Sequence, residues 1–294
     1  MKIKVNHKFH EFPEGITPKD VVEKLHLTAP EQAISVSVNG TPRDFNFPLS
    51  DHDELVFWQF DDPEGKEVFW HTSAHLLAQA ILRLWPNAQP TIGPPIEQGF
   101  YYDFGNLTLS DEDFEKIEKE VETILKENYK TERLEFAQKE DARLAFASNP
   151  YKVELINGFT ETPISAYRQG EFFDLCRGPH MAALSKIKAF KILKTSGAYW
   201  RGDSNREMLT RVYGISFPDK KKLKDYLQIL EEAKKRDHKV IGTALDLFSF
   251  QEEAPGMPFI HPRGLIIWNR LIEFFTRMLK RRGLSRDQNA FNDE

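Results

Sequence analysis

Two histidines, His71 and His75, lie four residues apart in the segment FWHTSAHLLAQA, whose apolar residues recur with helical spacing. This separation places both imidazoles on the same side of a helix, about one turn apart. Far along the chain, the segment DLCRGPH contains the only cysteine, Cys176, followed four residues later by His180. Histidine pairs of this spacing are more often structural than reactive. A Cys and a His from a distant segment complete a quartet able to line one pocket and perform metal, acid–base or nucleophile chemistry.

The composition describes a globular protein with room for two or three domains, because 40% of its 294 residues are hydrophobic and 12% are aromatic. No apolar run approaches the roughly 18 residues of a membrane span, and the first residues lack the apolar core of a signal peptide. One cysteine excludes an internal disulfide, so we expect a cytoplasmic protein with no membrane partner. The net charge of −5 gives no overall attraction to nucleic acid, so RNA contacts would need local basic patches such as 186–194 and 220–239.

Residues 1–61 alternate between short strand patterns and one helix pattern. Thr17 precedes Pro18 as an N-cap for a helix over 18–25, and Asn39-Gly40 is a hairpin signal. Strands are predicted over 1–5, 33–38 and 54–60. A small sheet crossed by one helix is a β-grasp pattern, and it holds no catalytic constellation, so we expect a docking or positioning module.

The next part of the chain reads as an α+β domain over about 66–217. Polar residues 61–66, with Pro and Gly, predict a linker, and the histidine helix should then run to Pro86. Tyr101 and Tyr102 alternate along a strand, so only one can face a pocket. Ser110 opens a helix over 110–129 with a capping box, and Lys152 stands alone among apolar neighbours. Further elements are a strand over 133–136, a helix over 139–147, and strands over 172–176, 190–196 and 209–217.

Two helices dominate the rest of the sequence. The first is a long basic helix predicted over 219–245. The second is an amphipathic helix over 265–282, whose apolar face is too large to leave exposed in a monomer. After Gly283 the letters SRDQNAFNDE indicate a tail.

An ordered series of stretches carries a resemblance to a known family: HTSAH, LWPNAQPTIGPPIEQGFYYDF, FFDLCRGPH, KTSGAYWRGDSN and LDLFSFQEEAPGMPFIHPRG. With them, residues 1–283 resemble the N-terminal part of a bacterial threonyl-tRNA synthetase. The resemblance implies a TGS (β-grasp) domain over 1–61, the second additional, editing domain over 66–217, a linker helix over 218–243, and a truncated start of the class II catalytic domain over 244–294.

The resemblance also implies an activity, hydrolysis of serine wrongly attached to threonine tRNA. Carried over residue by residue, its catalytic groups are His71, His75, Lys152, Cys176 and His180, and its amino-acid pocket adds Tyr102 and Asp174. The implied partners are the acceptor end of threonine tRNA and, through the amphipathic helix, a second copy in a homodimer.

Editing is expected to need no cofactor in this family, although related alanyl-tRNA editing domains suggest zinc at His71, His75, Cys176 and His180. ATP, Mg²⁺ and the catalytic-site zinc belong to family motifs that this sequence does not contain. We therefore expect a truncated chain without aminoacylation activity. Two alternatives stay open: a non-catalytic tRNA-binding or inactive remnant, and a zinc-binding module.

Overall fold

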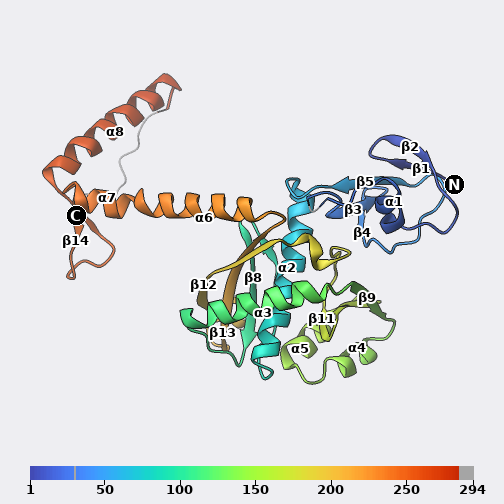
Figure 1. Ribbon diagram of the computed structural model, residues 1–294. Coiled ribbons are helices and arrows are strands. Elements are labelled where there is room, and N and C mark those ends of the chain that lie inside the picture. The colour runs from blue at the N-terminus through green and yellow to red at the C-terminus, as the bar shows by residue number, and fades with distance from the viewer. Residues whose placement is uncertain (30, 285–294) are drawn as a thin grey trace. The chain divides into compact units, whose positions relative to one another are not determined.

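The computed structural model describes residues 1–29 and 31–284, which form an α+β protein with several sheets (Figure 1). The α+β class expected from the sequence is therefore confirmed. The chain divides into two compact units, Met1–Leu223 and Lys224–Glu294.

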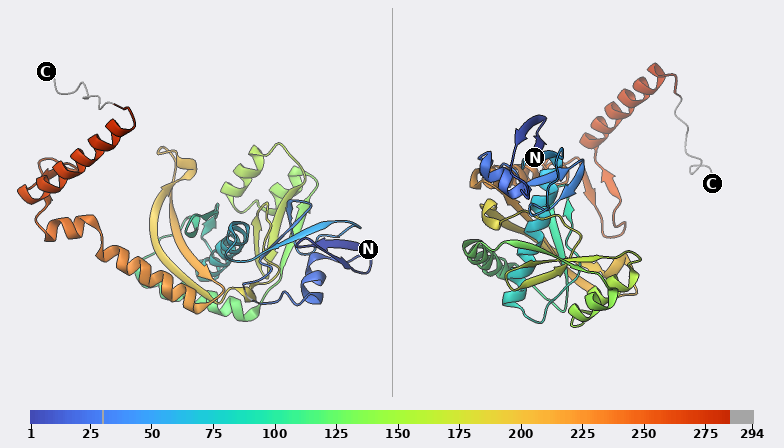
Figure 2. Two further views of the ribbon diagram at one scale, coloured as in Figure 1. Left: turned by 90° about the horizontal axis from the view of Figure 1, so that it is seen from above. Right: turned by 90° about the vertical axis from the view of Figure 1, so that its right-hand side faces the viewer.

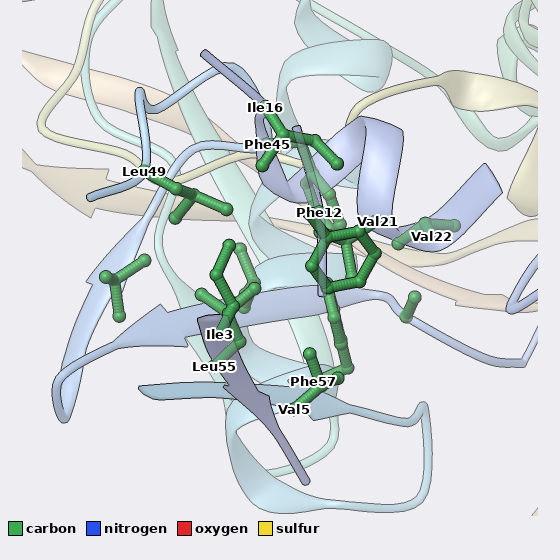
Figure 3. Packing of buried hydrophobic residues seen from close by; sticks show 13 residues of the cluster. Ile3, Val5, Phe12, Ile16, Val21, Val22, Phe45, Leu49, Leu55 and Phe57 are labelled. Atoms are coloured by element: carbon green, nitrogen blue, oxygen red, sulfur yellow. The ribbon is translucent and has the colours of Figure 1, made fainter. Parts of the chain in front are cut away.

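The chain begins with a five-stranded sheet in the order β2-β1-β5-β3-β4, in which β1 and β5 pair in parallel. Its strands are β1 (Lys2–Val5), β2 (Lys8–Glu11), β3 (Ser35–Val38), β4 (Thr41–Arg43) and β5 (Glu54–Trp58). Helix α1 (Pro18–Lys24) starts at Thr17, which forms a capping box with Asp20. The sheet and α1 enclose a core that includes Ile3, Val21 and Leu55 (Figure 3). The predicted helix and hairpin are confirmed, whereas β2 was not predicted.

Helix α2 (Pro63–Leu84) carries the two histidines and begins earlier than expected. The predicted linker over 61–66 is wrong, because Pro63 occupies the first helical turn, where its missing N–H costs nothing. Gly65 also has a packing role, since a Cβ there would lie 1.8 Å from the carbonyl oxygen of Gln59. The helix ends before Pro86 as predicted, and it is buried on nearly all sides rather than along one stripe.

A second sheet, in the order β12-β13-β8-β6 with β7 beside β8, packs against α2. Its strands are β6 (Gln89–Pro90), β7 (Pro95–Ile96), β8 (Gly99–Gly105), β12 (Ala189–Tyr199) and β13 (Met208–Phe217). Figure 2 shows β12 and β13 as a long curved hairpin. The short η3 (Trp200–Gly202) follows β12 directly and precedes β13. Helix α3 (Phe114–Glu127) packs on α2 and β12, and η1 (Asp111–Asp113) precedes it with the predicted capping box at Ser110.

A third sheet has the strand order β11-β10-β9. Its antiparallel strands are β9 (Thr131–Phe136), β10 (Ile164–Gln169) and β11 (Phe172–Leu175). Helices α4 (Lys139–Ala145) and α5 (Pro150–Gly158) join β9 to β10, and Asn149 caps α5. The short η2 (Leu184–Lys186) follows β11, and β10 was not predicted.

The second unit contains most of α6 (Lys220–Lys235), then α7 (His238–Ala244), β14 (Phe248–Phe250), β15 (Pro258–Ile260) and α8 (Pro262–Arg281). The single helix predicted over 219–245 is wrong, because the chain breaks between α6 and α7, where the Asp237 side chain accepts from the N–H of Lys239. The amphipathic pattern of α8 is confirmed, and its residues Ile267, Leu271 and Phe274 are exposed. The predicted tail, 285–294, lies outside the described residues. Among the helices that are described, none has the length and apolar character to cross a membrane.

Candidate active site

The structure brings together the four side chains of the predicted quartet, although they come from two distant segments. His71 and His75 extend from α2, and Cys176 and His180 lie in the loop after β11. One potential ligand atom from each residue lies within 4.8 Å of the others. The Cys176 Sγ is 3.2 Å from His71 Nε2 and 3.2 Å from His180 Nε2.

The loop after β11 is held in a shape that aims Cys176 at the histidines. The backbone N–H of Gly178 donates to Cys176 Sγ at 3.3 Å. Gly178 has a φ of 70°, and a Cβ at this position would lie 1.9 Å from the Tyr167 hydroxyl. Glycine is therefore required here both for the backbone conformation and for the close approach of Tyr167. The Tyr167 ring in turn packs on His180, with centroids 4.4 Å apart.

A second polar group, formed by Lys152, Asp174 and Tyr102, lies beside the quartet. The Lys152 ammonium forms an ion pair with Asp174 and lies 3.3 Å from the Tyr102 hydroxyl, which donates to the same carboxylate. The Lys152 and Asp174 side chains are only 2% and 3% exposed. Asp174 Oδ2 is 3.8 Å from His75 Nε2, which joins the two groups. Tyr101 faces elsewhere, against the Arg211 guanidinium, so the predicted alternation of the two tyrosines is confirmed.

Burial keeps the quartet uncharged near neutral pH. It lowers the pKa of His71 to about 4, and it holds the pKa values of His75 and His180 well below their usual range. Burial also raises the pKa of the Cys176 thiol to about 12. The site therefore offers three neutral imidazoles and a protonated thiol, next to a buried ion pair.

Three members of the quartet, His71, His75 and Cys176, and the Lys152 group line one cavity of about 700 Å³, whereas His180 lines a neighbouring cavity. His71, His75 and Cys176 form part of its wall, and Pro94 and Pro163 contribute apolar surface. This volume lies within the range of small-ligand sites, roughly 300–1,000 Å³. A second cavity, about 870 Å³, adjoins the first at His71 and Gly178.

Three imidazoles and one sulfur are also ligand types that zinc prefers. The two sulfur–nitrogen distances of 3.2 Å are close to the roughly 3.5 Å expected between donors on one tetrahedral zinc ion. By donor type and spacing, the four residues fit a metal site of the His-His-Cys-His kind.

One residue of the site was not predicted from the sequence. Thr72 lies between the two histidines of HTSAH and is fully buried, and its hydroxyl is 3.2 Å from His180 Nδ1. A hydroxyl on the same helix as the histidine pair was the available signal, but helical spacing alone does not indicate that it contacts a distant loop.

The comparisons with known proteins identify the class of domain first. The family described as the threonyl and alanyl tRNA synthetase second additional domain matches residues 164–213, a stretch that contains Asp174, Cys176 and His180.

Individual relatives then give a narrower match, because they are threonine–tRNA ligases. The ligase of Protochlamydia amoebophila is 63% identical over 273 residues, which cover 92% of this chain and 42% of the relative. That of Chlamydia trachomatis serovar L2b is 51% identical over 284 residues, 96% of this chain and 44% of the relative. That of Carboxydothermus hydrogenoformans is 49% identical over 275 residues, 92% of this chain and 43% of the relative.

The chain spans less than half the length of these curated relatives. It matches the N-terminal part of threonine–tRNA ligase and carries the second additional domain. The resemblance drawn from the sequence is thereby confirmed.

Proposed function

We propose that this chain hydrolyses the ester bond of serine wrongly attached to threonine tRNA, as the editing part of a threonine–tRNA ligase. The observation that carries the proposal is the convergence of His71, His75, Cys176 and His180, of which the first three line one cavity of about 700 Å³ together with Lys152. The match to the second additional domain supports the same assignment.

A physical argument explains why a threonine enzyme needs a second site. Serine is threonine without one methyl group, and a missing methyl changes binding by only about 1–3 kcal/mol. A synthetic site that accepts threonine therefore cannot reject serine strongly enough. A separate site that excludes the larger amino acid and hydrolyses the smaller one's ester solves this problem.

In the proposed mechanism, the histidine pair activates water. A neutral imidazole of His71 or His75 takes a proton from water while the water oxygen adds to the ester carbonyl carbon. The Lys152 ammonium stabilises the negative charge that develops on the carbonyl oxygen. The carbon–oxygen bond to the ribose then breaks, and the imidazolium returns its proton to the leaving ribose oxygen.

The remaining site residues are proposed to hold the amino acid. The Asp174 carboxylate accepts hydrogen bonds only, so it suits the ammonium or hydroxyl group of serine, and Tyr102 orients this carboxylate. Cys176 is proposed as a polar wall of the cavity, because a thiol whose pKa is about 12 is not the thiolate that a nucleophile requires.

The proposed domain organisation follows the family: TGS over 1–61, editing over 66–217, a linker helix over 218–243, and the start of the catalytic domain over 244–294. The proposed partners are the acceptor end of threonine tRNA and a second copy of the chain bound through α8. The exposed apolar face of α8 supports the latter.

The proposal is tested by deacylation of purified seryl- and threonyl-tRNA at high enzyme concentration. The seryl ester should be cleaved faster, and His71→Ala should lower its rate by about 10²–10⁴-fold, the usual size of acid–base catalysis. His238→Ala makes the same change at an exposed histidine outside the site and should leave the rate unchanged. If both esters were cleaved equally, or neither were cleaved above the spontaneous rate, the editing assignment would be wrong. The alternative of an inactive, tRNA-binding remnant would then be favoured.

A zinc site is the second candidate, and the His-His-Cys-His donor set favours it. His71, His75, Cys176 and His180 would hold the ion, and bound zinc supplies a Lewis acid for water or a carbonyl. Elemental analysis of the purified chain, together with deacylation after chelator treatment, distinguishes this candidate from the metal-free hydrolysis proposed above. Stoichiometric zinc whose removal abolishes activity would decide for the metal.

A further inference from the structure

The Thr72 hydroxyl occupies a position between α2 and the loop that carries His180. Its Oγ1 lies 2.8 Å from the carbonyl oxygen of Val68, 3.0 Å from the backbone nitrogen of Met181 and 3.2 Å from His180 Nδ1. The side chain is fully buried. With no solvent at this hydroxyl, each of the three neighbours must act either as a hydrogen-bond donor to it or as an acceptor from it.

A threonine hydroxyl donates one hydrogen bond and accepts two. The Met181 N–H can only donate, so it uses one lone pair of the hydroxyl oxygen. The Val68 carbonyl can only accept, and two oxygens 2.8 Å apart repel unless a proton lies between them. The hydroxyl proton therefore points to Val68, the usual partner of a helical threonine one turn back.

The second lone pair of Thr72 then faces His180 Nδ1, so this nitrogen must carry the proton. In a neutral imidazole the other nitrogen, Nε2, is left as a bare acceptor. His180 Nε2 is the atom that lies 3.2 Å from Cys176 Sγ. The tautomer fixed by Thr72 thus aims an electron pair into the centre of the quartet.

Neighbouring aromatic rings restrict the orientation of the His180 imidazole. It packs between the rings of His71, His75 and Tyr167, with centroid distances of 4.4, 4.2 and 4.4 Å. The Met181 N–H, the next backbone donor after His180, is bound to the same hydroxyl and holds the loop against α2.

We propose that Thr72 is a positioning residue that fixes His180 in the Nδ1-protonated tautomer, so that Nε2 presents its lone pair to Cys176 and to the reacting groups. This assignment deepens the proposed editing function and rests on it for its catalytic consequence. The tautomer itself is a property of the folded chain, and it is measurable without any substrate.

The test uses the full chain labelled with ¹⁵N in histidine, and it reads the tautomer from long-range ¹H–¹⁵N spectra assigned with His180→Gln. In the wild type and in Thr72→Ser, which keeps the hydroxyl, we expect a protonated Nδ1 and a bare Nε2 at His180. Thr72→Val has nearly the same shape but no oxygen, so it should give the other tautomer or a mixture. The matched control is Ser73→Ala, which removes a buried hydroxyl whose hydrogen bonds go to the Phe69 carbonyl and the Ser216 hydroxyl.

Seryl-ester hydrolysis supplies the second readout. Loss of a hydrogen-bond partner that orients a site histidine costs about 10–100-fold in metal sites, and we expect a loss of similar size for His180. We therefore expect kcat for Thr72→Val to fall by that factor with little change in KM, and Thr72→Ser and Ser73→Ala to stay within a few-fold of the wild type.

Two results would overturn the proposal: a protonated Nε2 at His180 in the wild type, or an unchanged spectrum and rate in Thr72→Val. If Thr72→Val does not fold, the spectra of the wild type and Thr72→Ser still decide the tautomer. If no form of the chain hydrolyses a seryl ester, the proposed function fails, whereas the spectra still answer the question about Thr72.

Discussion

Replacing Lys152 by methionine should destabilise the first unit strongly, because it removes one partner of a buried ion pair. The Asp174 carboxylate is 3% exposed, and without Lys152 it would keep the Tyr102 hydroxyl and the N–H of Leu175 as neutral donors. Removing one member of a buried pair typically costs about 3–5 kcal/mol, since the other charge stays buried and uncompensated. This is a large fraction of the roughly 5–15 kcal/mol that stabilises a native domain.

The assay is urea unfolding followed by circular dichroism. With a slope of about 2–3 kcal/mol per M, the loss corresponds to a midpoint lowered by roughly 1–2.5 M. Lys119→Met is the matched control, because Lys119 pairs with Glu115 on the surface of α3 at 2.7 Å, with side chains 71% and 76% exposed. An exposed pair of this kind contributes little net stability because solvent screens it, so the control midpoint should hardly move.

A second variant identifies the cause of the loss. Asp174→Asn added to Lys152→Met removes the unpaired charge and keeps an acceptor for Tyr102, so it should recover much of the lost stability. The reasoning is refuted if the Lys152→Met midpoint moves no more than that of Lys119→Met. It is refuted equally if the double variant is no more stable than Lys152→Met alone.

Three further predictions follow from single contacts. Cys176→Ser should keep at least about a tenth of the seryl-tRNA deacylation rate, because burial raises the pKa of the thiol to about 12 and leaves no thiolate to attack the ester. Complete loss of this activity would instead indicate that Cys176 acts as a nucleophile. Gly178→Ala should cost about 1–3 kcal/mol in thermal unfolding, since its Cβ would lie 1.9 Å from the Tyr167 hydroxyl, and Tyr167→Phe should recover part of that loss if the overlap is its cause. Burial lowers the pKa of Lys186 from 10.5 to about 8, so between these pH values the unfolded chain binds the proton more readily than the folded chain. The unfolding free energy of the wild type, relative to that of Lys186→Met, should therefore rise from pH 8 to pH 10.5. A difference that does not change with pH would contradict the lowered pKa.

Local patterns in the sequence were sufficient to predict many of the elements that carry the site. Helical spacing placed His71 and His75 on one side of α2, and the capping signals at Thr17 and Ser110 marked the starts of two helices. The linker was mistaken because Pro and Gly have two uses: Pro63 starts a helix, and Gly65 lets it pack closely on the preceding loop. Composition alone does not distinguish these uses from a flexible connection.

Features that depend on tertiary contacts could not be predicted in the same way. Strand β10 is buried on both faces for most of its length, so it shows no alternation of polar and apolar residues. The partner of Lys152 is Asp174, which follows it after strand β10. The hydroxyl beside His180 belongs to Thr72, 108 positions earlier in the chain. The resemblance supplied Lys152 and Asp174 as site residues, but only the structure pairs them.

The pairing of Lys152 with Asp174 bears on how the proposed site divides its work. The neutral quartet can supply a proton acceptor, but it cannot by itself stabilise the negative charge that develops on the carbonyl oxygen when water adds to the ester. In the proposed reaction Lys152 supplies that positive charge, and its ion pair with Asp174 offsets the cost of burying an isolated ammonium. Asp174 in turn lies 3.8 Å from His75 Nε2, but burial and the charge of Lys152 keep the pKa of this histidine low. The ion pair therefore supplies the charge that the substrate oxygen needs, while the base of the proposed reaction starts as a neutral imidazole.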